Sequence, residues 1–124
     1  MPKLCIKSRD ELVVIDTDKL AYVVADGNYS KLVYIEGLSS IISFGISRLE
    51  EILRKGEPIP NHPAFLRLGR SLLINQKYLL NISIPKQKLI LSDFGKNSHA
   101  LSVPKMLLKQ YKEDFEALQK ADSE

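Results

Sequence analysis

The chain has 124 residues, of which 44% are hydrophobic, a size that suits one domain with one buried core and leaves no room for a second full domain. It contains no run of the ~20 apolar residues that a membrane span needs. Its N-terminus also lacks the apolar stretch of a signal peptide. We therefore expect a single cytoplasmic domain over residues 1–120, with a frayed tail at 121–124.

The net charge of +3 is unevenly distributed along the chain. Residues 1–57 hold eight Lys or Arg against nine Asp or Glu, for −1; residues 58–112 hold nine against one acid, Asp93, for +8; residues 113–124 hold one against five, for −4. A basic region of this kind attracts polyanions. On charge, nucleic acid is the leading partner, and a solvated basic surface without a partner is the open alternative.

The first half of the chain alternates short β-branched runs with turn residues, which predicts consecutive strands. Residues 26–28 (Asp-Gly-Asn) favour a tight turn, so residues 20–36 are predicted to form a hairpin with Asn28 and Tyr29 at its tip. The predicted strands of this half are 4–7, 12–15, 20–24, 29–35 and 41–44.

A short helix is predicted after these strands. Ser47 and Glu50 have the spacing of a capping box, which indicates a helix over about 48–55 with Ser47 as its N-cap. Gly56 and Pro58 would end it and begin a connecting loop that runs to residue 63. Its apolar face, expected to pack on the sheet, consists of Leu49, Ile52 and Leu53.

The second half has the pattern of a strand meander followed by a helix, with turns at 85–87 and 94–97. Pro104 suits the first position of a helix that runs to about Lys120. We therefore predict a mostly β fold with two helices. The predicted strands are 64–68, 71–75, 79–84, 88–91 and 99–103. The apolar stripe of the final helix consists of Leu107 or Leu108, Tyr111, Phe115 and Leu118.

The motifs of common enzyme classes are missing from the sequence. No glycine-rich phosphate-binding loop occurs, and neither Ser47 nor Ser71 lies in a Gly-x-Ser-x-Gly elbow. His62 and His99 have no Cys, Asp or Glu at the short spacings of metal sites, and Cys5 has the setting of an ordinary strand residue. We expect no enzymatic activity, no cofactor and no metal.

Residues 65–75 read Phe-Leu-Arg-Leu-Gly-Arg-Ser-Leu-Leu-Ile-Asn. This segment resembles the Phe-x-Arg-x-His-Arg-Ser-x-x-Val-Asn segment of LytTR DNA-binding domains, which belong to the LytR/AlgR family of bacterial transcription regulators. The resemblance covers about residues 3–118. The other similar segments are the hairpin 20–34 with its Gly-Asn-Tyr turn, the helix 46–53, the strand 77–82 and the residues 100–105 before the last helix.

The resemblance implies an elongated β domain of antiparallel sheets with a C-terminal helix, whose loops and strand ends enter successive major grooves of double-stranded DNA. Gly69 departs from the His of that family, and Pro104-Lys105 replaces its common Arg, with Lys105 as the nearest basic substitute. The candidates for base contact are Arg70, Lys105, Asn28 and Ser30. The candidates for phosphate contact are Lys31, Arg67, Lys77, Lys86, Lys96 and Lys109.

Structural roles compete with several of these assignments. Tyr29 is equally suited to pack on the hairpin flank, and Asn28 to supply a left-handed backbone conformation. Arg67 is suited to an ion pair with an acid of the first half, and Asn75 to satisfying backbone groups at a strand end. Arg70 lies beside a glycine and outside an apolar alternation, so it is our first candidate for base recognition.

We accordingly predict sequence-specific binding of double-stranded DNA, with direct repeats as targets, and regulation of transcription. The protein would be a stand-alone LytTR protein or the C-terminal output domain of a response regulator. The resemblance leaves open a homodimer on DNA and a separate sensor or receiver chain as further partners. The alternative is a protein-interaction module that has kept the fold and lost specific DNA binding, with the apolar stripe of the final helix as its docking surface.

Overall fold

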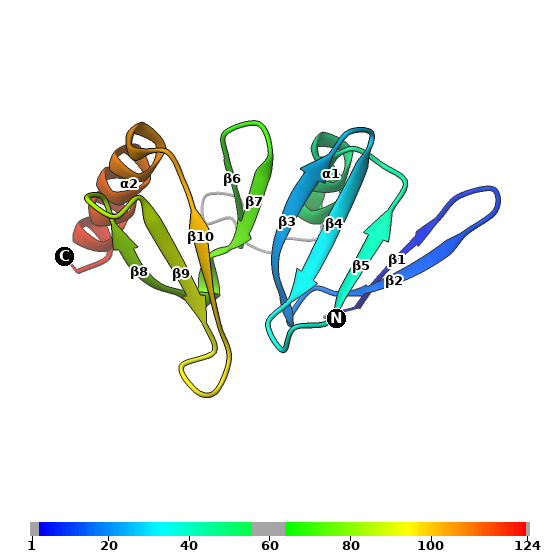
Figure 1. Ribbon diagram of the computed structural model, residues 1–124, viewed down its shortest axis with the longest axis horizontal. Helices are drawn as coiled ribbons and strands as arrows, with labels where there is room; N and C mark the ends of the chain where they lie inside the picture. Colours follow the sequence, from blue (N-terminus) through cyan, green and yellow to red (C-terminus); the bar gives the residue numbers. More distant parts are fainter. Residues whose placement is uncertain (1–2, 56–63, 124) are drawn as a thin grey trace. The chain divides into compact units, whose positions relative to one another are not determined.

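The computed structural model describes residues 3–55 and 64–123 of the chain. They belong to two compact units, Met1–Lys77 and Tyr78–Glu124, which we call unit 1 and unit 2. Ten strands and two α-helices occur among the described residues (Figure 1). Each predicted strand is present, with bounds that differ by one or two residues. The predicted mostly β fold class with two helices is therefore confirmed.

Unit 1 contains a two-stranded ribbon, β1–β2, and a five-stranded sheet in the order β5-β4-β3-β7-β6 (Figure 1). All neighbouring strands are antiparallel. The elements are β1 (Lys3–Lys7), β2 (Leu12–Asp16), β3 (Leu20–Asp26), β4 (Tyr29–Tyr34), β5 (Ser39–Ile42), α1 (Ile46–Lys55), β6 (Phe65–Leu68) and β7 (Leu72–Asn75). A short 3-10 helix, η1 (Gln76–Tyr78), follows β7.

The core of unit 1 is formed by α1, the β1–β2 ribbon and the five-stranded sheet. Alternation along β2 and β4 buries Ile15 and Leu32 completely, and α1 contributes Leu49 and Leu53 from its predicted apolar face. Burial of an aliphatic side chain of this size stabilises a fold by about 1.5 to 3 kcal/mol. A shift of one residue in either strand would turn these side chains to the wrong face, so the core holds the register of the strands.

The start of α1 differs from the prediction. The helix begins at Ile46, and the carbonyl of Gly45 accepts the first helical hydrogen bond, from the Leu49 N–H at 3.3 Å. Ser47 therefore lies inside the first turn, and the predicted capping box is wrong. The predicted helix terminators, Gly56 and Pro58, lie outside the described residues, as do the rest of the predicted loop to residue 63 and His62.

Strand β5 begins and ends two residues earlier than predicted. The apolar run at 41–44 suggested a strand that included Phe44, but the ladder pairs Ser39 with Val33 and Ile42 with Ser30. Phe44 instead lies beyond the strand and packs against the core. Tertiary pairing with β4 thus outweighs the local preference of the two serines.

Unit 2 is a three-stranded antiparallel sheet in the order β10-β9-β8, with one helix. Its elements are β8 (Leu79–Ser83), β9 (Lys88–Ser92), β10 (Ser98–Ser102) and α2 (Lys105–Ser123). Both predicted turns are present. Gln87 in the first and Phe94 in the second have positive φ angles, of 52° and 63°, which are uncommon for residues other than glycine.

Helix α2 contacts β8 and buries part of its predicted apolar stripe. Leu108 and Tyr111 are buried, and the ring of Phe115 meets that of Tyr111 edge-on at 6.2 Å. Pro104 precedes the helix rather than occupying its first position, because its carbonyl accepts the hydrogen bond of the Leu108 N–H. The helix extends to Ser123, past its predicted end at about Lys120.

Candidate nucleic-acid interface

Two turns lie side by side at one end of the five-stranded sheet (Figure 1). The first joins β3 to β4 at residues 27–28, and the second joins β6 to β7 at residues 69–71. The N–H of Ala25, at the end of β3, donates to the carbonyl of Ser71 at 2.9 Å. Segments more than forty residues apart in sequence therefore present their tips together, and we call this region the turn end of unit 1.

The β3–β4 turn exposes Asn28 and Tyr29. Asp26 pairs with Tyr29, which leaves a two-residue connection in which Gly27 has a φ angle of +63°. A glycine at the first central position is typical of type II′ hairpin turns. Among the described residues, the non-glycine positions with positive φ do not include Asn28, so its interpretation as a left-handed residue is wrong. Tyr29 is 53% exposed and only partly packs on the hairpin.

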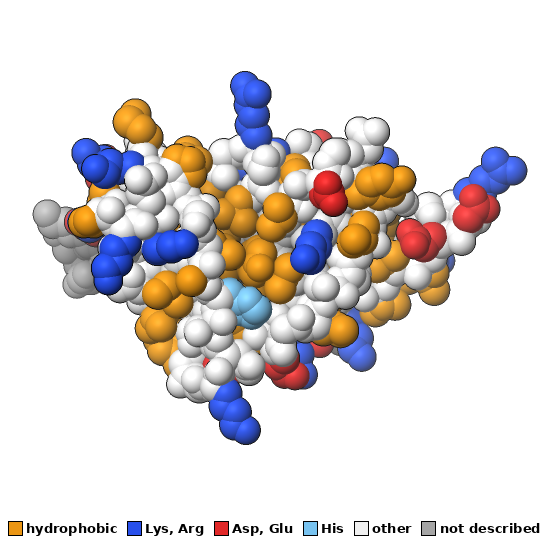
Figure 2. Space-filling view, in the orientation of Figure 1, with side chains coloured by type: hydrophobic (Ala, Val, Ile, Leu, Met, Phe, Trp, Pro, Cys, Tyr) orange, Lys and Arg blue, Asp and Glu red, His pale blue; other side chains and the backbone are white. Residues whose placement is uncertain are grey.

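The β6–β7 turn exposes Arg70 at its tip, where Figure 2 shows a projecting Lys or Arg side chain. Gly69 has a φ angle of +77°, a region that favours glycine over residues with a Cβ. The turn conformation therefore gives a physical reason for glycine at this position. A histidine here would strain the present backbone.

Arg67 holds this turn to α1. Its Nη1 donates to Oε1 of Glu50 at 3.0 Å and to Oγ of Ser47 at 3.3 Å, and its Nη2 donates to the carbonyl of Arg70 at 2.6 Å. Glu50 also pairs with Arg54 one turn further along the helix. The ion pair with a first-half acid, which the sequence left open, is thus what the structure contains. The guanidinium of Arg67 positions Arg70 rather than facing outward.

Ser30 is wrong as a candidate for base contact. Its side chain is fully buried, and its hydroxyl donates to the carbonyl of Phe44 at 2.8 Å. This bond ties the start of β4 to the segment that leads into α1. Ser30 therefore supports the turn end of unit 1 from inside.

Arg48 is a residue that the sequence analysis missed. It lies in the first turn of α1, is exposed, and places its guanidinium 5.3 Å from the centre of the Phe44 ring. The pairing of Ser30 with Ile42 brings this part of α1 to the same end of the sheet as Asn28 and Arg70. Only the strand register reveals that proximity, and the register is not encoded in a local motif.

The other two candidates from unit 1 lie at different places. Lys31 is exposed on β4. It lies two residues after Tyr29 and therefore on the same face of the strand. Lys77 lies at the opposite end of the sheet, where its ammonium binds Asp18 in the turn before β3. That hydrogen bond and the charge of Lys77 lower the pKa of Asp18.

Asn75 has the structural role that we considered for it. It is buried, and its Nδ2 donates to the carbonyls of Leu20 at 2.9 Å and Thr17 at 3.4 Å. Its Oδ1 accepts the N–H of Lys77 at 3.3 Å. These bonds close the end of the sheet that lies away from the turn end.

In unit 2, the basic residues divide between the two ends of the sheet. The β8–β9 turn and the start of α2 lie together, because the Val103 N–H donates to the carbonyl of Gln87 at 3.1 Å. Lys86 and Lys105 are exposed there, and Lys109 follows one helical turn later. We call this region the lysine end of unit 2.

Lys96 lies at the other end of unit 2, in the β9–β10 turn, whose tip carries a blue side chain in Figure 2. Asp93 holds this turn by accepting hydrogen bonds from the side chain of Asn97 and from the backbone N–H groups of Gly95 and Asn97, at 2.8 to 3.2 Å. These bonds, that of the Asn97 side chain foremost, lower the pKa of Asp93.

Comparison with known proteins found a likeness to solved structures. No protein-family model and no curated protein matches the sequence. A solved LytTr DNA-binding domain, from a protein of Bacillus cereus described as a methyl-accepting/DNA response regulator, matches with a TM-score of 0.58 over 91% of this chain and 95% of that chain, at 17% identity. The chain has the LytTR fold. The expected elements of that fold, antiparallel sheets and a C-terminal helix, are all present.

In the part of the chain that the structure describes, no helix is long and apolar enough to cross a membrane. Across residues 3–55 and 64–123, no three His, Cys, Asp or Glu side chains are grouped as metal ligands. Pro104 and Lys105, which stand where LytTR domains commonly have an arginine, are both exposed at the lysine end of unit 2.

Proposed function

We propose that the protein binds double-stranded DNA in a sequence-specific manner and regulates transcription, as a stand-alone LytTR protein or as the output domain of a response regulator. The observation that supports this best is the pairing of two turns at one end of the five-stranded sheet. Each turn exposes a side chain that can bind base edges, Asn28 and Arg70. The similar solved structure is itself a DNA-binding domain.

The turn end of unit 1 supplies recognition in this proposal. Arg70 can donate two hydrogen bonds to O6 and N7 of a guanine, and Asn28 can pair with an adenine, each contact contributing about 1 to 3 kcal/mol of discrimination. Arg48 and Lys31 are placed beside them to meet phosphates. Arg67 acts indirectly, since it fixes the turn that carries Arg70.

The lysine end of unit 2 supplies sequence-independent affinity. Lys105 lies in the first turn of α2, which contains no acidic residue, and Lys109 lies one turn later. This arrangement opposes the helix dipole, which favours anions at the N-terminus and cations at the C-terminus by about 0.3 to 1 kcal/mol each. Lysines that weaken their own helix in this way are better explained by an anion outside it. Lys86, on the adjacent turn, would meet the same DNA backbone, and Lys105 is also placed to reach a base.

The alternative is a protein-interaction module that docks through the α2 stripe of Leu107, Tyr111, Phe115 and Leu118. Tyr111 is buried and Leu107 and Phe115 are half-buried, so most of this stripe is covered. Leu118 is the exposed member of that stripe. We therefore keep DNA binding as the function that the site supports best.

The test is selection from a random duplex library with the purified protein, at low and at moderate salt. Phosphate contacts weaken as salt rises, whereas base recognition continues to discriminate. We expect a short, directly repeated motif that survives the higher salt. A folded protein that enriches no motif at either salt would contradict the proposal.

A further inference from the structure

The strand edges of unit 1 differ in how they are protected against pairing with another strand. Natural proteins protect such edges with charged side chains, prolines or bulges. The outer strand β1 carries Lys3 and Lys7, and β6, at one side of the five-stranded sheet, carries Arg67. At the other side, β5 consists of Ser39-Ser40-Ile41-Ile42 and has none of these features. Among the described strands, only β4 pairs with β5, and the outer edge of β5 carries no charged residue or proline.

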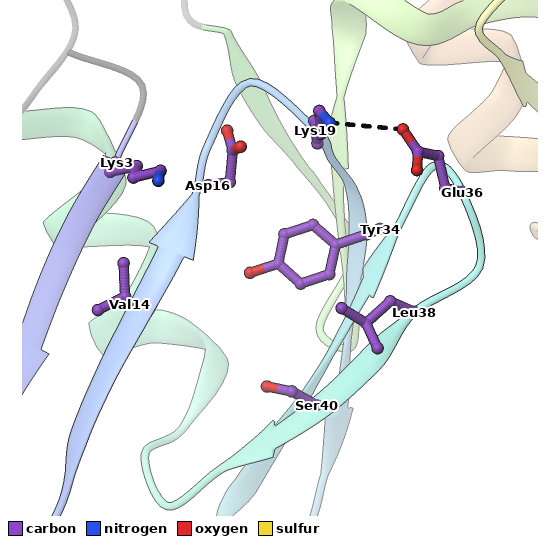
Figure 3. A pocket seen from close by; sticks show the side chains of 8 residues that line it. All are labelled: Lys3, Val14, Asp16, Lys19, Tyr34, Glu36, Leu38 and Ser40. Atoms are coloured by element: carbon purple, nitrogen blue, oxygen red, sulfur yellow. Dashed lines mark ion pairs between the residues drawn. The ribbon is translucent and has the colours of Figure 1, made fainter.

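A groove of about 460 Å³ lies between β2 and β5 (Figure 3). Among the described strands, β2 pairs with β1 alone and β5 with β4 alone, so each has one unpaired edge. Exposed apolar side chains stand on both sides, with Val14 55% and Leu38 72% exposed. The groove is lined by Lys3, Val14, Asp16, Lys19, Tyr34, Glu36, Leu38 and Ser40.

The charges around this groove cancel in pairs. Lys19 and Glu36 form an ion pair at 3.5 Å, and Lys3 stands opposite Asp16 in the register of the ribbon. Tyr34 lies between the two walls in Figure 3, and burial raises the pKa of its phenol, so the hydroxyl stays protonated. Such a groove gives no net attraction to a charged occupant and offers apolar contacts with a few hydrogen-bonding groups.

We propose that this groove binds an extended, uncharged peptide segment of a partner protein, which adds as a strand to the free edge of β5. The four residues of β5 extend over about 13 Å, and strand addition of this kind draws its affinity from main-chain hydrogen bonds and its specificity from alternate side chains. Side chains of the segment that point to the groove walls would contact Val14 and Leu38.

A partner segment fits this groove better than a second copy of the chain. The edge strands β1 and β6 of a second copy carry lysine or arginine, which the neutral groove does not favour. The β5 edge of a second copy is uncharged, and self-association through it is the outcome that the peptide-free control detects. A single extended segment of a partner can lack charged side chains altogether, which suits the neutral groove.

The test uses a blocked hexapeptide in which Val alternates with Thr, added to the whole chain labelled with ¹⁵N. We expect amide hydrogen exchange in residues 39–42 to slow by about tenfold or more on binding. A matched peptide with N-methyl groups at alternate residues should not bind, because it lacks the donors that pair with β5. Peptides with Glu or Lys in place of Thr should bind more weakly.

Two variants locate the site. Leu38→Lys places a charge in the groove and should weaken binding of the Val/Thr peptide by about tenfold. Leu80→Lys, at an exposed apolar position of β8, should leave binding unchanged, and thermal unfolding checks that both variants fold. The proposal is overturned if no protection appears at β5, if the N-methylated peptide binds equally well, or if β5 is protected by self-association without peptide. None of these results depends on DNA.

Discussion

The turn end of unit 1 and the lysine end of unit 2 are built differently. In unit 1, the arginine of the tip is held through a second arginine, a glutamate and a serine, and Gly69 has a backbone angle that suits glycine. In unit 2, Lys86 and Lys105 project from a turn and from a helix start as long, exposed side chains. A backbone held in place beneath an arginine suits the recognition of bases, and exposed lysines suit the attraction of phosphates. The difference suggests a division of work between specificity and affinity.

Arg67→Met removes the hydrogen bonds that join the β6–β7 turn to α1. Hydrogen bonds to charged groups contribute about 1.5 to 3 kcal/mol, and we expect a loss of that order in the free energy of unfolding measured with urea. The preference for the selected DNA site should fall as well, although Arg70 is still present. Arg54→Met removes an exposed pair with the same Glu50 and should cost no more than about 0.5 kcal/mol. Equal losses for both variants would show that Arg67 does not position the turn.

Arg70→Ala removes the exposed side chain at the tip of the β6–β7 turn. We expect discrimination at one base pair to fall by about 1 to 3 kcal/mol, with the stability of the fold unchanged because the side chain is exposed. The measurement compares binding of the selected duplex with duplexes substituted at each position. A uniform loss across all duplexes would assign Arg70 to phosphate contact instead.

Single lysine substitutions separate sequence-independent affinity from base recognition. Lys86→Gln and Lys105→Gln should each reduce the slope of log affinity against log salt by about 0.9. Lys86→Gln should weaken all duplexes alike, whereas any base contact by Lys105 would add a loss at one position. Lys77→Gln is the matched control, because Lys77 binds Asp18 at the end of unit 1 away from the turns. An equal effect from Lys77→Gln would restore it as a phosphate contact.

The smallest expected effect concerns pH and the β9–β10 turn. The pKa of Asp93 is lowered in the folded protein by its hydrogen bonds, so its carboxylate stabilises the fold above the unfolded pKa of about 3.9. That contribution is lost as the pH falls through the lower, folded value. Urea unfolding at pH 6 and at pH 3 should show a smaller acid-induced loss for Asp93→Ala than for the parent chain. An identical loss would mean that Asp93 does not hold this turn.

Local patterns in the sequence predicted much of the fold. Short β-branched and apolar runs between turn residues located the ten strands of the described residues, and the spacing of Leu49, Ile52 and Leu53 identified the apolar face of α1. The capping box failed because Ser47 and Glu50 serve Arg67 instead of the helix end. A motif cannot distinguish a local hydrogen bond from one to a strand further along the chain.

The candidate site was predicted only in part. Arg70 could be singled out because it lies beside a glycine and outside an apolar alternation, and the structure places it on the surface. Ser30 was a wrong candidate because the register of β4 buries its side chain. Arg48 was missed because only the same register shows that it is exposed at the turn end of unit 1. Lys77 was grouped with the other lysines by charge alone, and sequence gives no sign of its distance from the turns.

Base contact by the turn end of unit 1 can be measured by NMR. The ¹⁵N-labelled chain is titrated with the selected duplex and with a scrambled duplex of equal length. We expect the amides of residues 27–29 and 69–71 to shift with the selected duplex and much less with the scrambled one, whereas the side chain of Arg48, as a phosphate contact, should shift with both. Residues of the lysine end should shift with both. If the shifts that occur only with the selected duplex lie on other surfaces and the two turns are unchanged, the turn end of unit 1 does not contact bases.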